Sequence, residues 1–306
     1  MGPSARKQPA AEHSLWHWGM LLLGILAVST ASVLIRLAQA PALVIGAWRL
    51  LLASLFLTPW ALGAARREWG SLPPRSWLFL ALSGLALAIH FATWISSLAY
   101  TTVASSVILV STNPLFVGLG SHYLLGERMG KRRVLAIAIA MVGTVIVSYG
   151  DLSFSGRALL GDGLALLGAI SCSAYLLLGQ AVRKKLSTLA YVWPCYGIAG
   201  GTLLLLCLLS KQPLWGYDPR TVSIFALLAL VPQIIGHSAF NWALGHFSSL
   251  MVTLSILGEP IGATLLAFLI LGEVPPLTTL WGGVLILGGI YLASLEERAR
   301  PGPIDL

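Results

Sequence analysis

Charged residues are scarce in this chain of 306 residues. Asp, Glu, Lys and Arg together make up 10% of the sequence, whereas 57% of it is hydrophobic and the mean hydropathy is +0.85. Soluble domains are about 25% charged, so this composition excludes a water-soluble fold. Apolar stretches of roughly 18 to 24 residues recur along the whole chain, and each is long enough for a helix to cross a hydrocarbon layer about 30 Å thick. Because these stretches are continuously apolar, they predict helices rather than the alternating strands of a membrane barrel.

Cysteines and catalytic groups are also few. Cys172, Cys195 and Cys207 are odd in number, lie inside apolar stretches and lack the spacing of metal ligands, so we expect them to be packing residues. An enzyme within the membrane would need a nucleophile beside a base, or a cluster of metal ligands. His13 and His17 stand alone near the N-terminus, and no apolar stretch holds two acids in register. We therefore expect no enzymatic activity, no cofactor and no metal site.

The basic residues gather in short segments between the apolar stretches. If the N-terminus is cytoplasmic, about fourteen Lys and Arg fall in inner loops and about three in outer loops, which is the bias that orients membrane proteins. This distribution explains the net charge of +8 without a nucleic-acid partner. It predicts a multi-pass protein of the bacterial inner (plasma) membrane with both termini in the cytoplasm. The expected spans are 18–38, 42–62, 77–98, 102–124, 133–149, 160–181, 189–209, 221–243, 249–271 and 277–295.

Two segments of the chain are similar to each other. TNPLFVGLGSHYLLGE, from Thr112, aligns without a gap with GEPIGATLLAFLILGE, from Gly258, at an offset of 146 residues (258 less 112). A weaker echo has an offset of 144 residues (168 less 24). The first offset pairs Pro114 with Pro260, Gly126-Glu127 with Gly272-Glu273, Gly143 with Gly289 and Trp94 with Phe240; the second pairs Gly24 with Gly168 and Ser29 with Ser173.

This internal similarity predicts an all-α polytopic protein of ten transmembrane helices, divided into a half at 1–150 and a half at 151–306. Each half holds five spans. Because five is odd, the second half enters the membrane upside down, which is the inverted repeat that transporters use to alternate access to a central site. The Gly-Glu turn is therefore expected to face the cytoplasm at Glu127 and the outside at Glu273.

Four segments in this order and spacing resemble the EamA family of the drug/metabolite transporter (DMT) superfamily: PALVIGAWRLLLASL from Pro41, SSVILVSTNPLFVGLGSHYLLGER from Ser105, GDGLALLGAISCSAY from Gly161 and LGEPIGATLLAFLILGE from Leu257. The resemblance covers nearly the whole chain. It implies a transporter of ten helices in two inverted repeats, usually an exporter of amino acids or related metabolites, and it places Arg49 at the family's usual arginine position. The sequence departs from the family where Ser29-Thr30 replaces Trp-Gly and Ser173 replaces Trp in many members, so no member's substrate is carried over.

Polar side chains inside spans are the candidates for function, because an ionisable group there costs several kcal/mol unless it faces a cavity or a partner. His90, Trp94 and Ser97 share one helical face, and His237 and Asn241 repeat the four-residue spacing in the other half. The two faces predict a shared cavity. Coupling of transport to protons through a histidine and a simple hydrogen bond between helices both remain open.

Paired prolines predict paired kinks. Asn113 precedes Pro114 and Glu259 precedes Pro260, and a proline there removes a backbone hydrogen bond and opens the helix. One interpretation is a hinge at the membrane midplane, with Glu259 as the counter-ion of a substrate amine or as a proton carrier. The other is a kink fixed for packing, with Glu259 bound to a Ser or Arg of a neighbouring helix.

Arg49 also has two interpretations. Its guanidinium can hold a substrate carboxylate in a bidentate way, or it can form an ion pair with Asp162 or Glu259. Tyr100 and Tyr175 are either aromatic walls of the cavity or part of an interfacial belt. The predicted cavity residues are His90, Trp94, Asn113, His237, Asn241, Glu259, Arg49, Tyr100 and Tyr175, with Pro114 and Pro260 as hinges.

Together these features predict a secondary transporter, and more specifically an exporter of small polar metabolites such as amino acids, that works by alternating access. A channel is the main alternative, followed by an intramembrane enzyme. The expected partners are a small-molecule substrate and the lipid bilayer, with protons and a second copy of the chain left open. We consider a homodimer because small residues permit close contact between helices, either within one half or with another protomer. These residues are Gly282-Gly283 and Gly288-Gly289.

Overall fold

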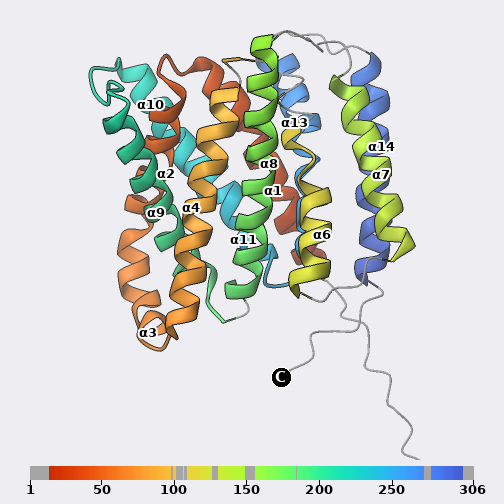
Figure 1. The fold of residues 1–306 in the computed structure, drawn as a ribbon, viewed down its shortest axis with the longest axis horizontal. Helices are drawn as coiled ribbons and strands as arrows, with labels where there is room; N and C mark the ends of the chain where they lie inside the picture. The colour runs from red at the N-terminus through yellow and green to blue at the C-terminus, as the bar shows by residue number, and fades with distance from the viewer. Residues whose placement is uncertain are drawn as a thin grey trace, which may run out of the picture.

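The computed structural model describes residues 14–97, 99–100, 106, 109–125, 130–148, 156–183, 185–271 and 277–298. Helices and their connecting turns make up all of these residues, and ten helical segments run side by side (Figure 1). The two Gly-Glu turns at Glu127 and Glu273, and the boundary between the predicted halves near residue 150, lie outside the described residues.

The first five segments come from the N-terminal half. They are α1 (Leu15–Leu37); α2 (Ala42–Trp60), which continues through η1 (Ala61–Ala65) into α3 (Arg66–Gly70); α4 (Pro74–Ser97); α6 (Asn113–Leu125); and α7 (Lys131–Ser148).

The other five segments belong to the C-terminal half. They are α8 (Gly156–Arg183); α9 (Thr188–Leu209); α10 (Pro219–Leu228), which continues through η3 (Ala229–His237) into α11 (Ser238–Ala243); α12 (Ser249–Ile256), followed by α13 (Glu259–Leu266) and η4 (Ala267–Leu271); and α14 (Leu277–Arg298). Where the structure describes them, the predicted spans agree with these helices to within a few residues.

Polar side chains at the ends of helices accept the backbone N–H groups that a helix leaves unpaired. Ser187 caps α9 by accepting a hydrogen bond from the N–H of Ala190, and Ser248 caps α12 in the same way. Asp218 caps α10, with Pro219 at the first helical position. Because lipid offers no hydrogen bonds, polar residues of this kind mark where these three apolar helices begin.

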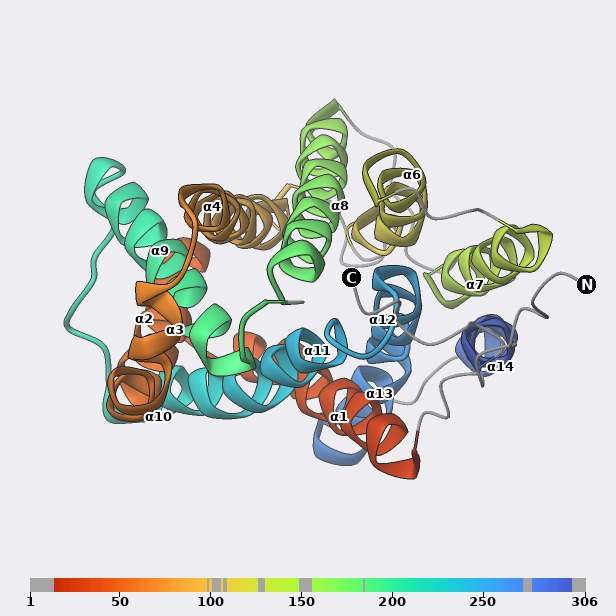
Figure 2. The same cartoon turned by 90° about the horizontal axis from the view of Figure 1, so that it is seen from below.

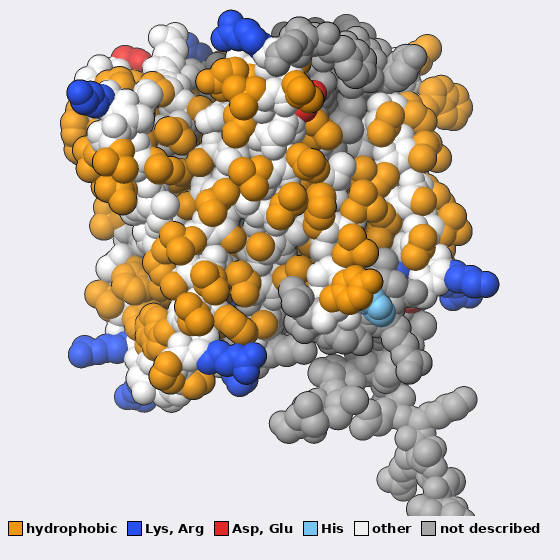
Figure 3. All heavy atoms as spheres, in the orientation of Figure 1, with side chains coloured by type: hydrophobic (Ala, Val, Ile, Leu, Met, Phe, Trp, Pro, Cys, Tyr) orange, Lys and Arg blue, Asp and Glu red, His pale blue; other side chains and the backbone are white. Residues whose placement is uncertain are grey.

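Seven described helices are long and apolar enough to cross a membrane: Leu15–Ile35, Ala42–Gly70, Pro74–Ser97, Arg157–Arg183, Thr188–Leu209, Pro219–Ala243 and Ser249–Ile270. Leu280–Glu296 is a shorter apolar helix. Apolar side chains cover the visible face of the molecule, and Lys and Arg side chains lie toward its upper and lower ends (Figure 3). A band of this kind matches the hydrocarbon layer of a bilayer.

Helix contacts between the halves follow a reciprocal pattern. The third segment, α4, packs on the sixth, α8, and the eighth segment packs through η3 on the first, α1. In the same way α6 packs on α8, and α13 packs on α1. The second segment, α2, also packs on η3, and the seventh, α9, on α4, which is again reciprocal. Three further pairs join segments of the same rank: α2 with α9, α6 with α12, and α7 with α14. Figure 2 shows α7 and α14 together at one end of the molecule, and α2, α9 and α10 at the other.

The contact between α7 and α14 is reciprocal at the level of single residues. A Cβ atom on Gly143 would lie 2.6 Å from the carbonyl oxygen of Gly282, and one on Gly289 would lie 2.8 Å from that of Ala136. Gly289 and Gly282 are the positions 146 residues after Gly143 and Ala136. The same contact is therefore made twice in opposite directions, and glycine is required at both places because another side chain would meet backbone.

Candidate functional site

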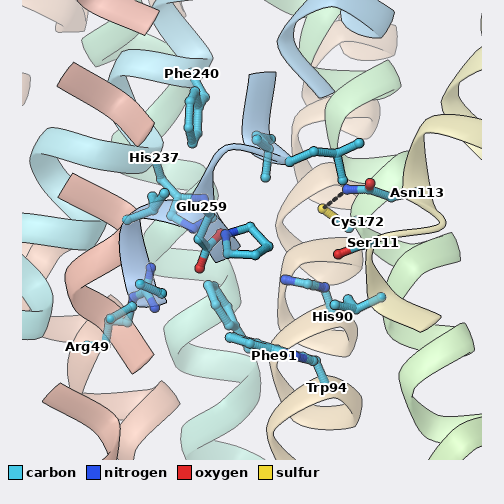
Figure 4. A pocket seen from close by; sticks show the side chains of 17 residues that line it. Arg49, His90, Phe91, Trp94, Ser111, Asn113, Cys172, His237, Phe240 and Glu259 are labelled. Atoms are coloured by element: carbon cyan, nitrogen blue, oxygen red, sulfur yellow. Dashed lines mark hydrogen bonds between the residues drawn. The ribbon is translucent and has the colours of Figure 1, made fainter. Parts of the chain in front are cut away.

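A cavity of about 130 Å³ lies at the centre of the helices, between the two halves (Figure 4). This volume is close to that of an engineered protein cavity of ~150 Å³ that binds benzene, so the cavity suits a small ligand. Apolar side chains form most of the wall, among which a few polar groups stand out. The lining residues are Val28, Ala31, Arg49, His90, Phe91, Trp94, Val110, Ser111, Asn113, Cys172, His237, Phe240, Ile256, Leu257, Glu259, Pro260 and Ala263.

Most of the residues that the sequence singled out meet at this cavity. Arg49 comes from α2, His90 and Trp94 from α4, Asn113 from α6, His237 from η3, and Glu259 and Pro260 from α13. Four of these seven residues come from the N-terminal half and three from the C-terminal half. Asn241, Tyr100, Tyr175 and Pro114 are not among the residues that line the cavity.

Arg49 is almost fully buried, with 2% of its surface exposed. Its Nε donates a hydrogen bond of 2.7 Å to Oε1 of Gln233, and its guanidinium lies 4.6 Å from the centre of the Phe91 ring. Neither Glu259 nor Asp162, both within the described residues, forms a salt bridge with it. The direct ion pair considered as one alternative is therefore absent, although Glu259 acts on Arg49 through space, and the hydrogen-bond partner of the arginine is uncharged.

Both prolines stand where a helix restarts. A turn precedes α6, whose first residues are Asn113 and Pro114, and a turn precedes α13, whose first residues are Glu259 and Pro260. The backbone carbonyls at these breaks accept hydrogen bonds from serines of the opposite half. The bonds are Ser173 Oγ to Asn113 O at 3.1 Å and Ser29 Oγ to Glu259 O at 3.2 Å.

Histidines occupy two sides of the cavity. Nδ1 of His90 lies 3.0 Å from the carbonyl oxygen of Gly168, so this hydrogen bond between helices is present. Because a carbonyl can only accept, Nδ1 is the nitrogen that carries the proton. The His90 ring stacks on Trp94 with a centroid distance of 5.8 Å, and the His237 ring lies 5.6 Å from that of Phe91.

Tyr175 and Asn241 are buried in a hydrogen-bonded cluster rather than placed at the cavity. The Tyr175 hydroxyl donates to Asn241 Oδ1 at 2.8 Å, and Asn241 Nδ2 donates to the carbonyl of His237 at 2.8 Å and to the Tyr196 hydroxyl at 3.3 Å. These bonds join α8, α9 and α11. Tyr100 follows the end of α4 and is 40% exposed.

Sequence reasoning missed several residues at the cavity or directly behind its wall. Phe91 and Gln233 contact Arg49, although Gln233 itself does not line the cavity. Cys172 was predicted to be a packing residue, but its side chain lines the cavity and its Sγ lies 3.8 Å from Asn113 Nδ2. A polar amide in an apolar stretch is a signal that could have identified Gln233.

Charges of opposite sign face the cavity, with Arg49 and Glu259 on different helices from different halves (Figure 4). Asn113, Ser111 and the histidines add neutral hydrogen-bonding groups. This arrangement can hold a small molecule that carries a negative and a positive group. Among the described residues, no group of three or more His, Cys, Asp or Glu side chains could hold a metal ion.

Comparisons with known proteins agree with this picture. The profile of the EamA-like transporter family matches the chain at residues 15–149 and again at 159–295. An uncharacterized transporter of Archaeoglobus fulgidus is 28% identical over 260 residues, which cover 82% of this chain and 87% of that protein. A probable terminal-alkyne amino-acid exporter of Streptantibioticus cattleyicolor is 27% identical over 206 residues, 66% of this chain and 67% of that protein. A solved crystal structure shares the fold, with a TM-score of 0.79 and 18% identity over 94% of this chain and 99% of that chain.

Proposed function

The chain belongs to the EamA-like transporter family, and we propose from this premise and from the cavity that it exports a small amino acid or a closely related metabolite. The family is one of multi-pass membrane transporters and not of enzymes, so a small-molecule substrate follows from membership. The resemblance drawn from the sequence motifs is thereby confirmed. The identity of the substrate and the direction of transport belong to the proposal.

The observation that carries the proposal is the pair of opposite charges at the cavity. Arg49 is a buried cation that forms no salt bridge with a described carboxylate, and Glu259 acts on it only through space. A substrate carboxylate would supply the missing negative charge through bidentate hydrogen bonds. Glu259 would then face the substrate's amine. The relative from Streptantibioticus cattleyicolor, described as an exporter of an amino acid, supports this substrate class.

Alternating access is proposed because the two halves make reciprocal contacts. The α7–α14 crossing repeats itself at Gly143 and Gly289, and the serine-to-carbonyl bonds of Ser29 and Ser173 do the same around the cavity. Reciprocal contacts of this kind support two inverted five-helix repeats, with ten transmembrane helices in all. A site between such repeats can open to one side at a time if the breaks before Pro114 and Pro260 act as hinges.

The proposal also includes the orientation of the protein in the membrane. Basic segments near Arg66, Arg75, Lys131 and Lys185 favour a cytoplasmic position for that end of the bundle, with both termini on the same side. The membrane would then be the bacterial inner membrane. We also propose a domain boundary near residue 150, and the interval between the two segments that match the family profile, 15–149 and 159–295, supports it.

Transport by purified protein in proteoliposomes tests the function. We expect saturable exchange of at least one of the twenty common L-amino acids. Arg49→Leu should lower the rate by at least about thirtyfold, because removing one partner of a buried charge pair costs about 2 kcal/mol or more. The melting temperature of the same variant is measured to show that it is folded, because the change also removes the hydrogen bond to Gln233 and the contact with Phe91.

Arg157→Leu is the matched control, because Arg157 is exposed at the start of α8 and does not line the cavity. It should transport at the wild-type rate. Wild-type exchange by the folded Arg49→Leu protein, or failure of all twenty amino acids to exchange, would contradict the proposal. Flux that does not saturate would indicate a channel instead.

A further inference from the structure

The hydrogen-bond partner of Arg49, behind the wall of the cavity, is an uncharged amide. Gln233 lies in η3 directly after Pro232, none of its surface is exposed, and its Oε1 accepts the hydrogen bond from Arg49 Nε. A buried arginine paired with a carboxylate would have its charge cancelled by that partner. With Gln233 as the partner, the guanidinium is oriented but its positive charge is retained.

Gln233 lowers the stability of the fold at this position. Its Nε2 is buried and has no hydrogen-bond partner among the residues that the structure describes. An unpaired buried N–H group destabilises a protein, so packing alone does not account for the amide. The bond from Gln233 uses Nε of Arg49 and leaves the two terminal nitrogens of the guanidinium for another acceptor.

Phe91 limits the movement of the same guanidinium from a second direction. Its ring comes from α4 and lies 4.6 Å below the Arg49 Cζ, a distance typical of a cation–π contact. Gln233 and Phe91 thus hold the arginine by one edge and one face. Both contacts are neutral, so neither reduces the charge that Arg49 presents beside the cavity.

We propose that Gln233 is a positioning residue that determines the charge of the substrate, by holding Arg49 toward the cavity with a hydrogen bond that does not neutralise it. This inference rests on the proposed function. With Arg49 positive and Glu259 negative, the polar wall selects a molecule that has both a carboxylate and an amine. A carboxylate at position 233 would form the ion pair that Arg49 now lacks, and the cavity would then select a molecule with an amine and no carboxylate.

The test compares Gln233→Glu with the wild type in lipid nanodiscs. The probes are the twenty common L-amino acids and their amides, which keep the amine but lack the carboxylate, and the measurement is thermal stabilisation as a function of concentration. We expect the wild type to bind at least one amino acid about tenfold more tightly than its amide, the size expected for a hydrogen bond to a charged group. Gln233→Glu should reverse that order.

Gln180→Glu is the matched control. Gln180 lies on α8, is 6% exposed and, like Gln233, has a buried side-chain atom without a partner and does not line the cavity, but it does not bond to Arg49. It places a buried carboxylate elsewhere in the same protein and should keep the wild-type order of probes. An unchanged order in Gln233→Glu, or the same reversal in Gln180→Glu, would overturn the inference.

Failure of the proposed function gives a different result. If no amino acid stabilises the wild type, the substrate class is wrong, and a comparison of ligand-free variants then decides the role of Gln233. Gln233→Glu should have a higher melting temperature than Gln233→Leu when Arg49 is present, and a lower one in the Arg49→Leu background, because the carboxylate is paired only in the first case. Equal differences in both backgrounds would show that Gln233 does not position Arg49.

Discussion

The hydroxyl of Ser29 on α1 donates a hydrogen bond of 3.2 Å to the carbonyl oxygen of Glu259, the first residue of α13. The same hydroxyl lies 2.7 Å from the carbonyl of Ile25, one turn earlier on its own helix. Ser173 on α8 does the same for Asn113, at 3.1 Å, and for Ala169, at 2.8 Å. Each half therefore uses its first helix to satisfy the helix break in the fourth helix of the other half.

Ser29→Ala and Ser173→Ala should destabilise the protein by similar amounts. Each change leaves one carbonyl at a helix break without its partner from the other half, and hydrogen bonds between membrane helices contribute about 0.6 kcal/mol on average. The measurement is thermal unfolding in detergent. Because the two sites are separate, the double variant should show the sum of the two effects. No change in either variant would contradict a structural role for these bonds.

Gly289→Ala should destabilise the α7–α14 pair. The new methyl group would lie 2.8 Å from the backbone carbonyl of Ala136, which cannot move without shifting α7, and forced contacts of this kind cost about 1–3 kcal/mol. Gly288→Ala is the control, since a Cβ there has nothing within 4 Å. It should be neutral or slightly stabilising, because alanine favours a helix over glycine by up to about 1 kcal/mol. Equal melting temperatures for the two variants would argue against the close crossing.

Cysteines at Lys131 and Leu277 should react from opposite sides of the membrane. Both residues are exposed and begin equivalent helices, α7 and α14, at the offset of 146 residues. If the halves are inverted, Lys131→Cys is labelled by an impermeant thiol reagent from the cytoplasmic side and Leu277→Cys from the outside. The three native cysteines are buried, and their replacement by alanine gives the background for the assay. Labelling of both positions from one side would contradict the inverted repeat.

His246 should make the protein less stable as the pH falls. It lies between α11 and α12, outside the membrane helices, and its ring is 4.1 Å from that of Trp242 and 4.9 Å from that of His17. Burial lowers the pKa of His246 below its ordinary value of 6.5, and the positive charge of Arg183 acts in the same direction. The unfolded chain then binds a proton more readily than the folded one, so stability is lost as the pH falls through 6.5.

The measurement is the melting temperature at pH 7.5 and at a pH of about 5.5, on either side of the histidine's ordinary pKa. The wild type should lose more stability between these values than His246→Gln, which has no proton to take up. A larger loss in His246→Gln than in the wild type would reverse the sign and refute the assignment.

Much of the helical framework follows from the sequence because a bilayer imposes a fixed length on each apolar segment. The predicted span at 249–271 is occupied by α12, α13 and η4, and Pro260 lies next to the break between α12 and α13. The reciprocal contacts between the two halves are harder to predict from the sequence. They depend on which glycines and serines of each helix lie against a helix of the other half. The packing of the whole bundle determines this, and no local sequence pattern does.

The cavity was only partly predictable for a geometric reason. An ionisable side chain within a span is stable only where it faces a cavity or a polar partner. Arg49 and Glu259 could therefore be assigned to a cavity on energetic grounds. His237 and Asn241 share a helical face, but they lie about 6 Å apart along the axis, and Asn241 falls beyond the cavity into a cluster with Tyr175. The partnership of Arg49 with Gln233 joins residues 184 positions apart, and no local pattern predicts it.

The crossing of α7 and α14 has the form of a contact between two identical subunits, but both helices here belong to one polypeptide. In a pair of identical five-helix chains, any substitution would appear on both sides of the central cavity. Joined in one chain, the halves can diverge, and Asn113 stands where the other half has Glu259. A single acidic group can therefore face a single arginine, and a ligand with two unlike ends has only one way round in which to bind.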